Sequence, residues 1–129
     1  MKRQSFDIDS FRHANPIPCV TRIGPLLMSS IIVSRDPGGD TVPETIEAQL
    51  DNLFHHVGEM LHAAGADWQH VAKMTFYMPS LDLRAQLNVP WVAHFPDPAS
   101  RPARHTQLAP TSYAQCDFVA YVDDVDDVE

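Results

Sequence analysis

The sequence predicts an α+β domain in which two helices cover one face of a mixed, six-stranded sheet. Apolar residues recur at helical spacing over residues 46–64 and 83–95, which indicates two amphipathic helices. The other apolar segments are short and bounded by turn residues, as strands are. Each helix connects two strands, and right-handed crossovers place both helices on the same face of one sheet.

Three strands are expected before the first helix. Phe6 and Ile8 alternate with aspartates, which indicates a short first strand. Residues 19–23 and 26–33 predict a hairpin, because the intervening Gly24-Pro25 is typical of a tight turn.

The first helix is bounded by recognisable end residues. Thr41 and Glu44 have the spacing of a capping box, and Gly65 is typical of the residue that ends a helix. The apolar residues between these ends fall on one side of the helix: Ile46, Leu50, Leu53, Phe54, Val57, Met60, Leu61 and Ala64.

The second half of the chain predicts a strand, a helix and two strands. Residues 71–78 form the first of these strands, and Ser80 can cap the helix that follows. That helix has an apolar stripe made of Leu83, Leu87, Trp91 and Phe95. Residues 103–108 and 115–122 are the final two strands.

One face of this sheet is left without a helix. In strand 71–78, Met74 and Phe76 alternate with Thr75 and Tyr77, so both faces of the strand carry large side chains. An uncovered apolar face usually binds a partner, so we expect self-association, with the number of subunits open.

Composition narrows the class of protein. The 129 residues predict one domain, residues 1–122, followed by an acidic tail, residues 123–129. The formal net charge is −8, and about −3 without the tail, which argues against nucleic-acid binding. No apolar run approaches the roughly 20 residues that span a bilayer, so no membrane contact is expected. Two cysteines in apolar surroundings, Cys19 and Cys116, indicate buried, reduced thiols and a cytoplasmic protein.

Several short features then occur in a fixed order along residues 13–122. They are Ser29-Ser30, Ala63-Ala64-Gly65, Val71-Ala72-Lys73-Met74-Thr75, Leu87-Asn88 and Pro102-Ala103-Arg104. In this order and spacing the chain resembles the reactive intermediate deaminase family, also called Rid or YjgF. The resemblance implies a chorismate-mutase-like fold and a homotrimer, with a central barrel of sheets, helices outside and ligand clefts between subunits. It also implies hydrolysis of 2-imino or 2-enamino acids, or of a related enamine carboxylate from a catabolic pathway, to 2-oxo acids and ammonia, without a cofactor.

The resemblance also implies a substrate site. Arg104 matches the family arginine that holds the substrate carboxylate, and Ser30 and Asn88 match two further family positions. Four positions depart from the pattern: Ile17 stands for a tyrosine, Ile31 for a glycine, Thr106 for a cysteine and Val119 for a glutamate. The residues expected to bind substrate are therefore Ile17, Ser30, Ile31, Asn88, Arg104, Thr106 and Val119.

Two residues are expected to perform the chemistry. The planar guanidinium of Arg104 suits bidentate binding of a carboxylate, although a surface ion pair is an alternative role. Asp117 shares a strand face with Val119 and is the nearest carboxylate that can replace the glutamate, although it can also be an ordinary exposed strand residue. His13 precedes the entry loop and can approach the cleft, but it is expected to be a solvated histidine.

The seven histidines do not indicate a metal site. His55, Glu59 and His62 lie opposite the apolar side of the first helix, so we expect a solvated face there and no bound metal. His56, His70 and His94 are expected at the surface or partly packed, and the two tryptophans are expected to be packing residues.

A catalytically weak trimer that binds small carboxylates is the competing function. Ribonuclease activity is disfavoured by the acidic charge balance.

Overall fold

The computed structural model describes residues 2–123 as one sheet with two helices packed on it. The strands are β1 (Arg3–Phe6), β2 (Val20–Ile23), β3 (Leu26–Ser29), β4 (Ile32–Val33), β5 (Val71–Met78), β6 (Ala103–Leu108) and β7 (Gln115–Tyr121). The helices are α1 (Ile46–Ala63) and α2 (Arg84–His94), with short 3-10 turns at Trp68–His70 and Leu81–Leu83. Apart from Asp123, the predicted acidic tail lies outside the described residues.

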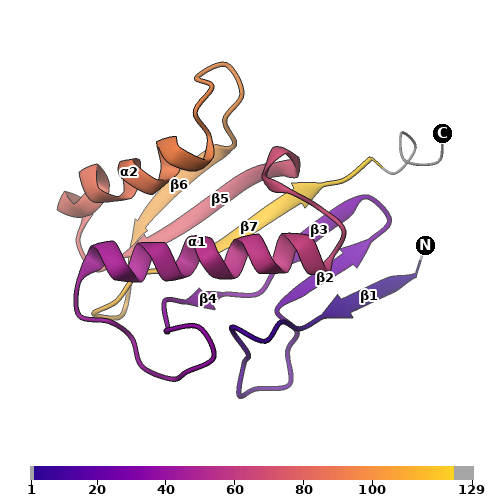
Figure 1. The fold of residues 1–129 in the computed structure, drawn as a ribbon, viewed down its shortest axis with the longest axis horizontal. Helices are drawn as coiled ribbons and strands as arrows, with labels where there is room; N and C mark the ends of the chain where they lie inside the picture. Colours follow the sequence, from indigo (N-terminus) through magenta and orange to yellow (C-terminus); the bar gives the residue numbers. More distant parts are fainter. Residues whose placement is uncertain (1, 124–129) are drawn as a thin grey trace.

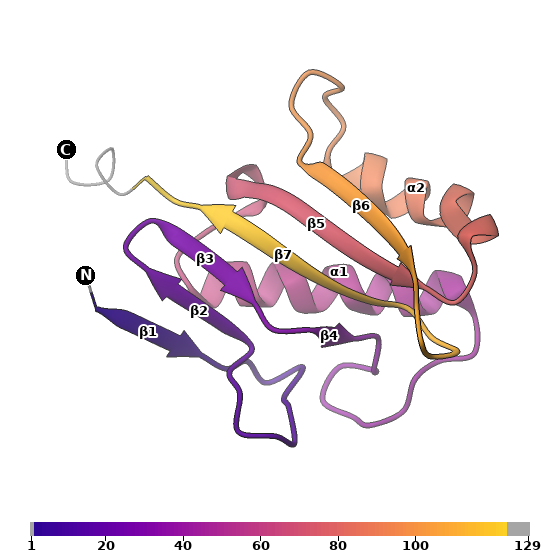
Figure 2. The ribbon, with the colours of Figure 1, turned by 180° about the vertical axis from the view of Figure 1, so that it is seen from behind.

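The sheet is mixed, and both helices lie on one of its faces, as the sequence predicts. Its strands follow the order β1-β2-β3-β7-β5-β6, and β4 also pairs with β7. The β5–β6 pair is parallel and the other pairs are antiparallel. Figure 1 shows α1 and α2 in front of the sheet, and Figure 2 shows the opposite face without a helix. Among residues 2–123, no helix is both long and apolar enough to cross a membrane.

The sheet has seven strands instead of six because the predicted strand 26–33 is interrupted. Met28 pairs with Val119 and Ile32 pairs with Cys116. Residues 29–31 therefore face only two residues of β7, 117 and 118. This extra residue makes a β-bulge at Ser29-Ser30-Ile31. There the Ser29 hydroxyl oxygen accepts a 2.9 Å hydrogen bond from the Phe118 amide, which a backbone carbonyl would accept in a regular ladder.

Two predicted element ends are wrong. The first strand ends at Phe6, and Ile8, which was expected in it, is instead buried in the core beyond the strand. The first helix is capped by Thr45, whose hydroxyl accepts a hydrogen bond from the Ala48 amide at 3.3 Å. Thr41 lies in the preceding loop, where its carbonyl accepts from the Asp36 amide at 2.8 Å. Local spacing cannot distinguish two threonines four residues apart, and the loop contact decides between them.

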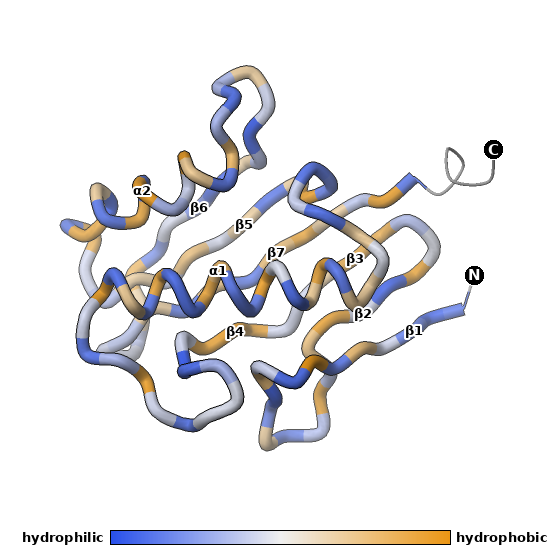
Figure 3. The backbone as a smooth tube through the Cα atoms, in the orientation of Figure 1, coloured by the Kyte–Doolittle hydropathy of each residue, from blue (hydrophilic) through white to orange (hydrophobic). Residues whose placement is uncertain are grey.

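The core lies between the helices and the covered face of the sheet. Alternate residues of β5 and β7 point into it, including Met74, Phe76 and Phe118. The helix α1 supplies the other side with Leu50, Leu53, Val57, Met60 and Leu61. Figure 3 shows hydrophobic and hydrophilic residues alternating around α1, as a helix with one buried side requires.

The opposite surface, which we term the open face, keeps large apolar side chains exposed. Ile23, Leu26, Met28 and Tyr121 are each between 40% and 57% exposed. Strand pairing brings them together, because Ile23 is opposite Leu26, and Leu26 is opposite Tyr121. Isolated apolar residues are normal at a surface, but a contiguous group of them indicates an interface.

A buried histidine joins α1 to two segments that are distant in sequence. His56 is fully buried, contrary to the surface or partly packed position expected for it. Its Nε2 lies 2.7 Å from the Arg35 carbonyl oxygen, and its Nδ1 lies 3.0 Å from the Ser10 hydroxyl. Since a carbonyl only accepts, Nε2 carries the proton and Nδ1 accepts from Ser10. Burial lowers the pKa of His56 below its ordinary value, so the ring is neutral in the folded protein.

We expect His56 to make folding stability fall as pH decreases below about 6.5, the ordinary histidine pKa. Below that pH the unfolded chain binds a proton that the folded chain resists, so the free energy of unfolding decreases until the lowered pKa is reached. Urea melts between pH 8 and pH 5 measure this loss.

His56→Gln should cost about 1–3 kcal/mol at pH 8, because it disturbs two buried hydrogen bonds, and should flatten the decrease. His55→Gln, at an exposed neighbouring position, should keep the wild-type slope. A wild-type slope in His56→Gln would contradict the assignment.

Candidate active site

Arg104 lies on β6 and points toward the helix layer. It pairs with Met74, whose side chain is buried under the helices, so the two side chains leave the sheet on the same side. Its Nη1 donates a 2.9 Å hydrogen bond to Asn88 Oδ1 on α2. The guanidinium also lies over the Trp91 ring, with Cζ 5.1 Å from the ring centroid. The structure thus brings together two of the predicted site residues, Arg104 and Asn88.

The guanidinium of Arg104 is half-buried and carries an unbalanced charge. Among the described residues it forms no ion pair, so the alternative of a surface ion pair is not what this protomer shows. Its pKa is lowered from the ordinary arginine value, first by loss of contact with water and second by the charge of Arg84. A cation held by an amide and an aromatic ring, without a carboxylate, is suited to bind an anion.

Thr106 shares the strand face of Arg104, as alternation along β6 predicts. It pairs with buried Phe76 and is itself half-buried. Its hydroxyl therefore lies on the same side of the sheet as the guanidinium, two residues further along the strand.

A second set of predicted site residues gathers at the β-bulge. Ser30 and Ile31 occupy the interruption between β3 and β4, facing Asp117 and Phe118 on β7. The Ser30 amide donates to the Cys19 carbonyl at 3.0 Å, which keeps the loop before β2 beside the bulge. That loop includes Ile17, which is 43% exposed.

Asp117 lies on the open face, where it has a tyrosine partner. Tyr77 Oη donates a 3.0 Å hydrogen bond to Asp117 Oδ2. The pKa of Tyr77 is raised by burial first and by this contact second, so the phenol keeps its proton. Asp117 is half-buried, not fully exposed, and Val119 follows two residues later on the same face. The hydrogen bond from Tyr77 thus fixes the orientation of the half-buried Asp117 carboxylate.

The two sets of residues cannot meet within one protomer. Arg104 points to the helix side of the sheet, whereas Asp117 points to the open face. In addition, β5 lies between β6 and β7. A site that uses both groups therefore needs a second copy of the chain.

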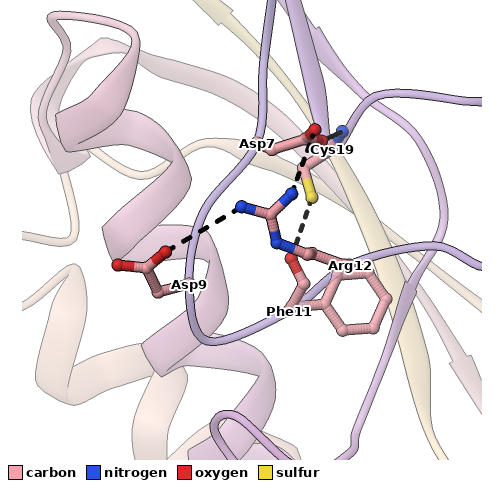
Figure 4. Close-up of polar contacts among 5 residues, drawn as sticks. All are labelled: Asp7, Asp9, Phe11, Arg12 and Cys19. Atoms are coloured by element: carbon pink, nitrogen blue, oxygen red, sulfur yellow. Dashed lines mark hydrogen bonds and ion pairs between the residues drawn. The ribbon is translucent and has the colours of Figure 1, made fainter.

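The cationic side chain beside Ile17 is already neutralised. Figure 4 shows Arg12 between two carboxylates, with Nη1 3.5 Å from Asp7 Oδ2 and Nη2 3.9 Å from Asp9 Oδ1. Arg12 also lines a hollow of about 350 Å³ together with Ile17. The hollow therefore does not offer a free cation for a substrate carboxylate, unlike the surroundings of Arg104.

His13 differs from the solvated histidine that we expected. Its ring packs edge-on against Phe11, with centroids 5.0 Å apart, and its Nε2 is buried without a hydrogen-bond partner. Burial, and then the charge of Arg35, lower the pKa of His13. His13 lines the same hollow as Ile17, but its Nε2 is buried and cannot contact a substrate in this conformation.

The outer side of α1 carries the histidines and the glutamate that were considered as metal ligands. His55 Nε2 lies 3.4 Å from Glu59 Oε2, and both side chains border an open hollow of about 720 Å³. Over residues 2–123, no group of three or more metal-binding side chains comes together. The hollow contains none of the predicted site residues, so its size alone does not make it the site.

Three residues near the site were not identified as such from the sequence. Trp91 was assigned to packing; it is buried, but it also supports the guanidinium of Arg104. Its spacing of three residues from Asn88 could have indicated that both share a helix side. Tyr77 and Arg84 gave no local pattern, because their contacts depend on strand register and on the position of α2 over β6.

Sequence and fold comparisons relate the chain to known proteins. A family model described as "Endoribonuclease L-PSP" matches residues 10–111. The chain is 35% identical over 68 residues to Reactive Intermediate Deaminase A, chloroplastic, from Arabidopsis thaliana. That match covers 53% of this chain and 35% of the plant protein, so the chain spans about a third of that relative's length.

Solved structures match nearly the whole chain. RidA from an Antarctic Psychrobacter species superposes with a TM-score of 0.84 at 22% identity, over 92% of this chain and 99% of that chain. The YjgF gene product of E. coli has a TM-score of 0.81 at 19% identity, over 92% and 98% of the two chains. A putative endoribonuclease from Thermotoga maritima has a TM-score of 0.83 at 23% identity, over 95% and 99%. These matches confirm the predicted chorismate-mutase-like fold.

Proposed function

This chain belongs to the Rid/YjgF/L-PSP family, and we propose that it hydrolyses small 2-imino or 2-enamino acids to 2-oxo acids and ammonia. The observation that carries the proposal is the half-buried guanidinium of Arg104, held by Asn88 and Trp91 without a carboxylate partner among the described residues. The relative named Reactive Intermediate Deaminase A supports the same chemistry.

Arg104 binds the carboxylate of the substrate. Its contact with Asn88 occupies one N–H of Nη1, and its other N–H groups are available to grip two carboxylate oxygens. The Trp91 ring fixes the plane of the guanidinium and excludes water from one side. Both effects strengthen a charge-assisted hydrogen bond.

Asp117 orients the water that attacks the imine carbon. Tyr77 holds Oδ2, which leaves Oδ1 to accept a hydrogen bond from that water. As the C–O bond forms, the C=N electron pair moves to nitrogen, and a proton of the attacking water passes through Asp117 to that nitrogen. The hydroxyl proton of the resulting carbinolamine then follows by the same route, the C–N bond breaks, and ammonia leaves the 2-oxo acid. Water is the sole co-reactant, so the chemistry needs no cofactor.

The two groups meet between subunits of a homotrimer. In this arrangement the open faces turn inward as a barrel and bury the exposed apolar group of Ile23, Leu26, Met28 and Tyr121. Arg104 of one protomer then reaches the bulge of its neighbour. Ile17, Ile31 and Val119 provide apolar walls there, and the hydroxyls of Ser30 and Thr106 contact the polar end of the substrate.

Binding without efficient turnover is the second candidate. It is favoured by Val119, an apolar side chain at the position where the family resemblance implies a glutamate. RNA cleavage is less suited to the chain despite the name of the matching family model, because a net charge of −8 repels phosphates. The cytoplasmic location stays a prediction from its two cysteines, both of which are buried and unpaired.

Arg104→Ala should lower kcat/KM by about 10- to 100-fold, the value of one charge-assisted hydrogen bond pair. The assay generates a 2-imino acid in situ with an amino-acid oxidase and traps the remainder with semicarbazide. Arg101→Ala is the matched control, because Arg101 is exposed and bonds the Phe95 carbonyl, away from Asn88. Wild-type rates in Arg104→Ala would exclude the proposed role. Absence of turnover by the wild type, with measurable binding of 2-oxo acids, would favour the binding protein.

Mixed trimers test whether each site draws on two protomers. Arg104→Ala and Asp117→Asn should each keep at most about a tenth of the wild-type activity, and refolding them together in equal amounts should raise it. Random assembly restores about one quarter of the sites, because each required group is intact with a probability of about one half. If Arg104 and Asp117 acted from the same protomer, every site would carry one defect and the mixture would stay at the activity of the single variants.

Tyr77→Phe should lower kcat by about 3- to 10-fold with little change in KM, because Asp117 loses its orienting hydrogen bond. In an Asp117→Asn background the same change should have no further effect, since coupled residues are non-additive. Tyr113→Phe is the control, because Tyr113 lies in the loop between β6 and β7, outside the apolar group of the open face. Equal effects of Tyr77→Phe in both backgrounds would show that Tyr77 does not act through Asp117.

A further inference from the structure

A second arginine, Arg84, lies on the side of α2 that faces Arg104 of β6. Arg84 begins α2 and precedes Asn88 by four residues and Trp91 by seven, which is the spacing of one helix side. Asn88 and Trp91 are the residues that contact Arg104, at 2.9 Å and 5.1 Å. The side of α2 that holds the Arg104 guanidinium therefore begins with another guanidinium.

The charges of the two arginines are not balanced within the described chain. Arg84 Nε donates to the Leu81 carbonyl at 3.1 Å, and Arg104 Nη1 donates to the Asn88 amide oxygen. Neither forms an ion pair among residues 2–123, although Asp82 is close in sequence to Arg84. The pKa of Arg104 is lowered first by burial and second by the charge of Arg84, in keeping with their positions on either side of Asn88.

Two neighbouring cations without a counterion destabilise each other, and an anion with two negative charges relieves this repulsion. The Leu81 carbonyl holds Arg84 near the start of α2, so the second cation has a defined place relative to Asn88 and Arg104. One carboxylate satisfies a single guanidinium bidentately. A second carboxylate on the same molecule satisfies the other.

We propose that Arg84 and Arg104 together select 2-imino dicarboxylic acids, the class that includes the imines of aspartate and glutamate. This inference rests on the proposed function and identifies its substrate class. Arg104 binds the carboxylate next to the imine carbon, and Arg84 binds the distal carboxylate. Arg84 is thus a specificity-determining residue, whereas the hydrolytic step is the same for monocarboxylic and dicarboxylic imines.

Parallel assays with two substrates test the proposal. L-glutamate oxidase generates the dicarboxylic imine, an L-amino-acid oxidase generates the imine of leucine, and semicarbazide traps what remains. Arg84→Gln should lower kcat/KM for the dicarboxylic imine by about 10-fold or more and change the monocarboxylic value by less than about twofold. Arg104→Ala should lower both values. Arg101→Gln, the matched control, should change neither value.

Equilibrium binding separates failure of this inference from failure of the proposed function. By calorimetry, wild-type protein should bind 2-oxoglutarate at least about 10-fold more tightly than 2-oxobutyrate, and Arg84→Gln should lose the difference. No turnover of any imine, with this preference intact, would overturn the proposed hydrolysis and support the dicarboxylate site. Turnover without any preference, or equal losses on both substrates in Arg84→Gln, would overturn the dicarboxylate site alone.

Discussion

The helices cover one face of the sheet, and this constraint controls where every charged group of the candidate site can point. Side chains alternate along a strand, so each residue of β5, β6 and β7 belongs either to the helix side or to the open face. Arg104 falls on the first side and Asp117 on the second. Self-association is therefore a requirement of the proposed chemistry as well as a means of burying apolar surface.

The bulge and the buried histidine perform related structural tasks around this sheet. At Ser29-Ser30-Ile31 the extra residue interrupts pairing with β7, and the Ser29 hydroxyl compensates the freed Phe118 amide. His56 compensates the Ser10 hydroxyl and the Arg35 carbonyl in the same way. Each of these side chains thus satisfies polar groups that regular pairing leaves free, which lets an irregular segment lie against a packed core.

The site beside α2 shows how a packing residue can also tune a charge. Trp91 is buried in the core, and its ring also lies under the Arg104 guanidinium. Asn88, three residues earlier on α2, accepts a hydrogen bond from one edge of that guanidinium. These two contacts hold Arg104 half-buried near Arg84. Such a cation is prepared to bind an anion before the anion arrives, which reduces the ordering cost of binding.

The sequence by itself determined the helices, most strand positions, the shared strand face of Asp117 and Val119 and the uncovered face, because these follow from periodicity along one segment. Only the tertiary structure decided the bulge, the Thr45 cap, the burial of His56 and the contacts of Arg104 with Asn88 and Trp91. Each of these depends on which distant segments lie side by side. Periodicity assigns a residue to a face, but the register between segments chooses its partner.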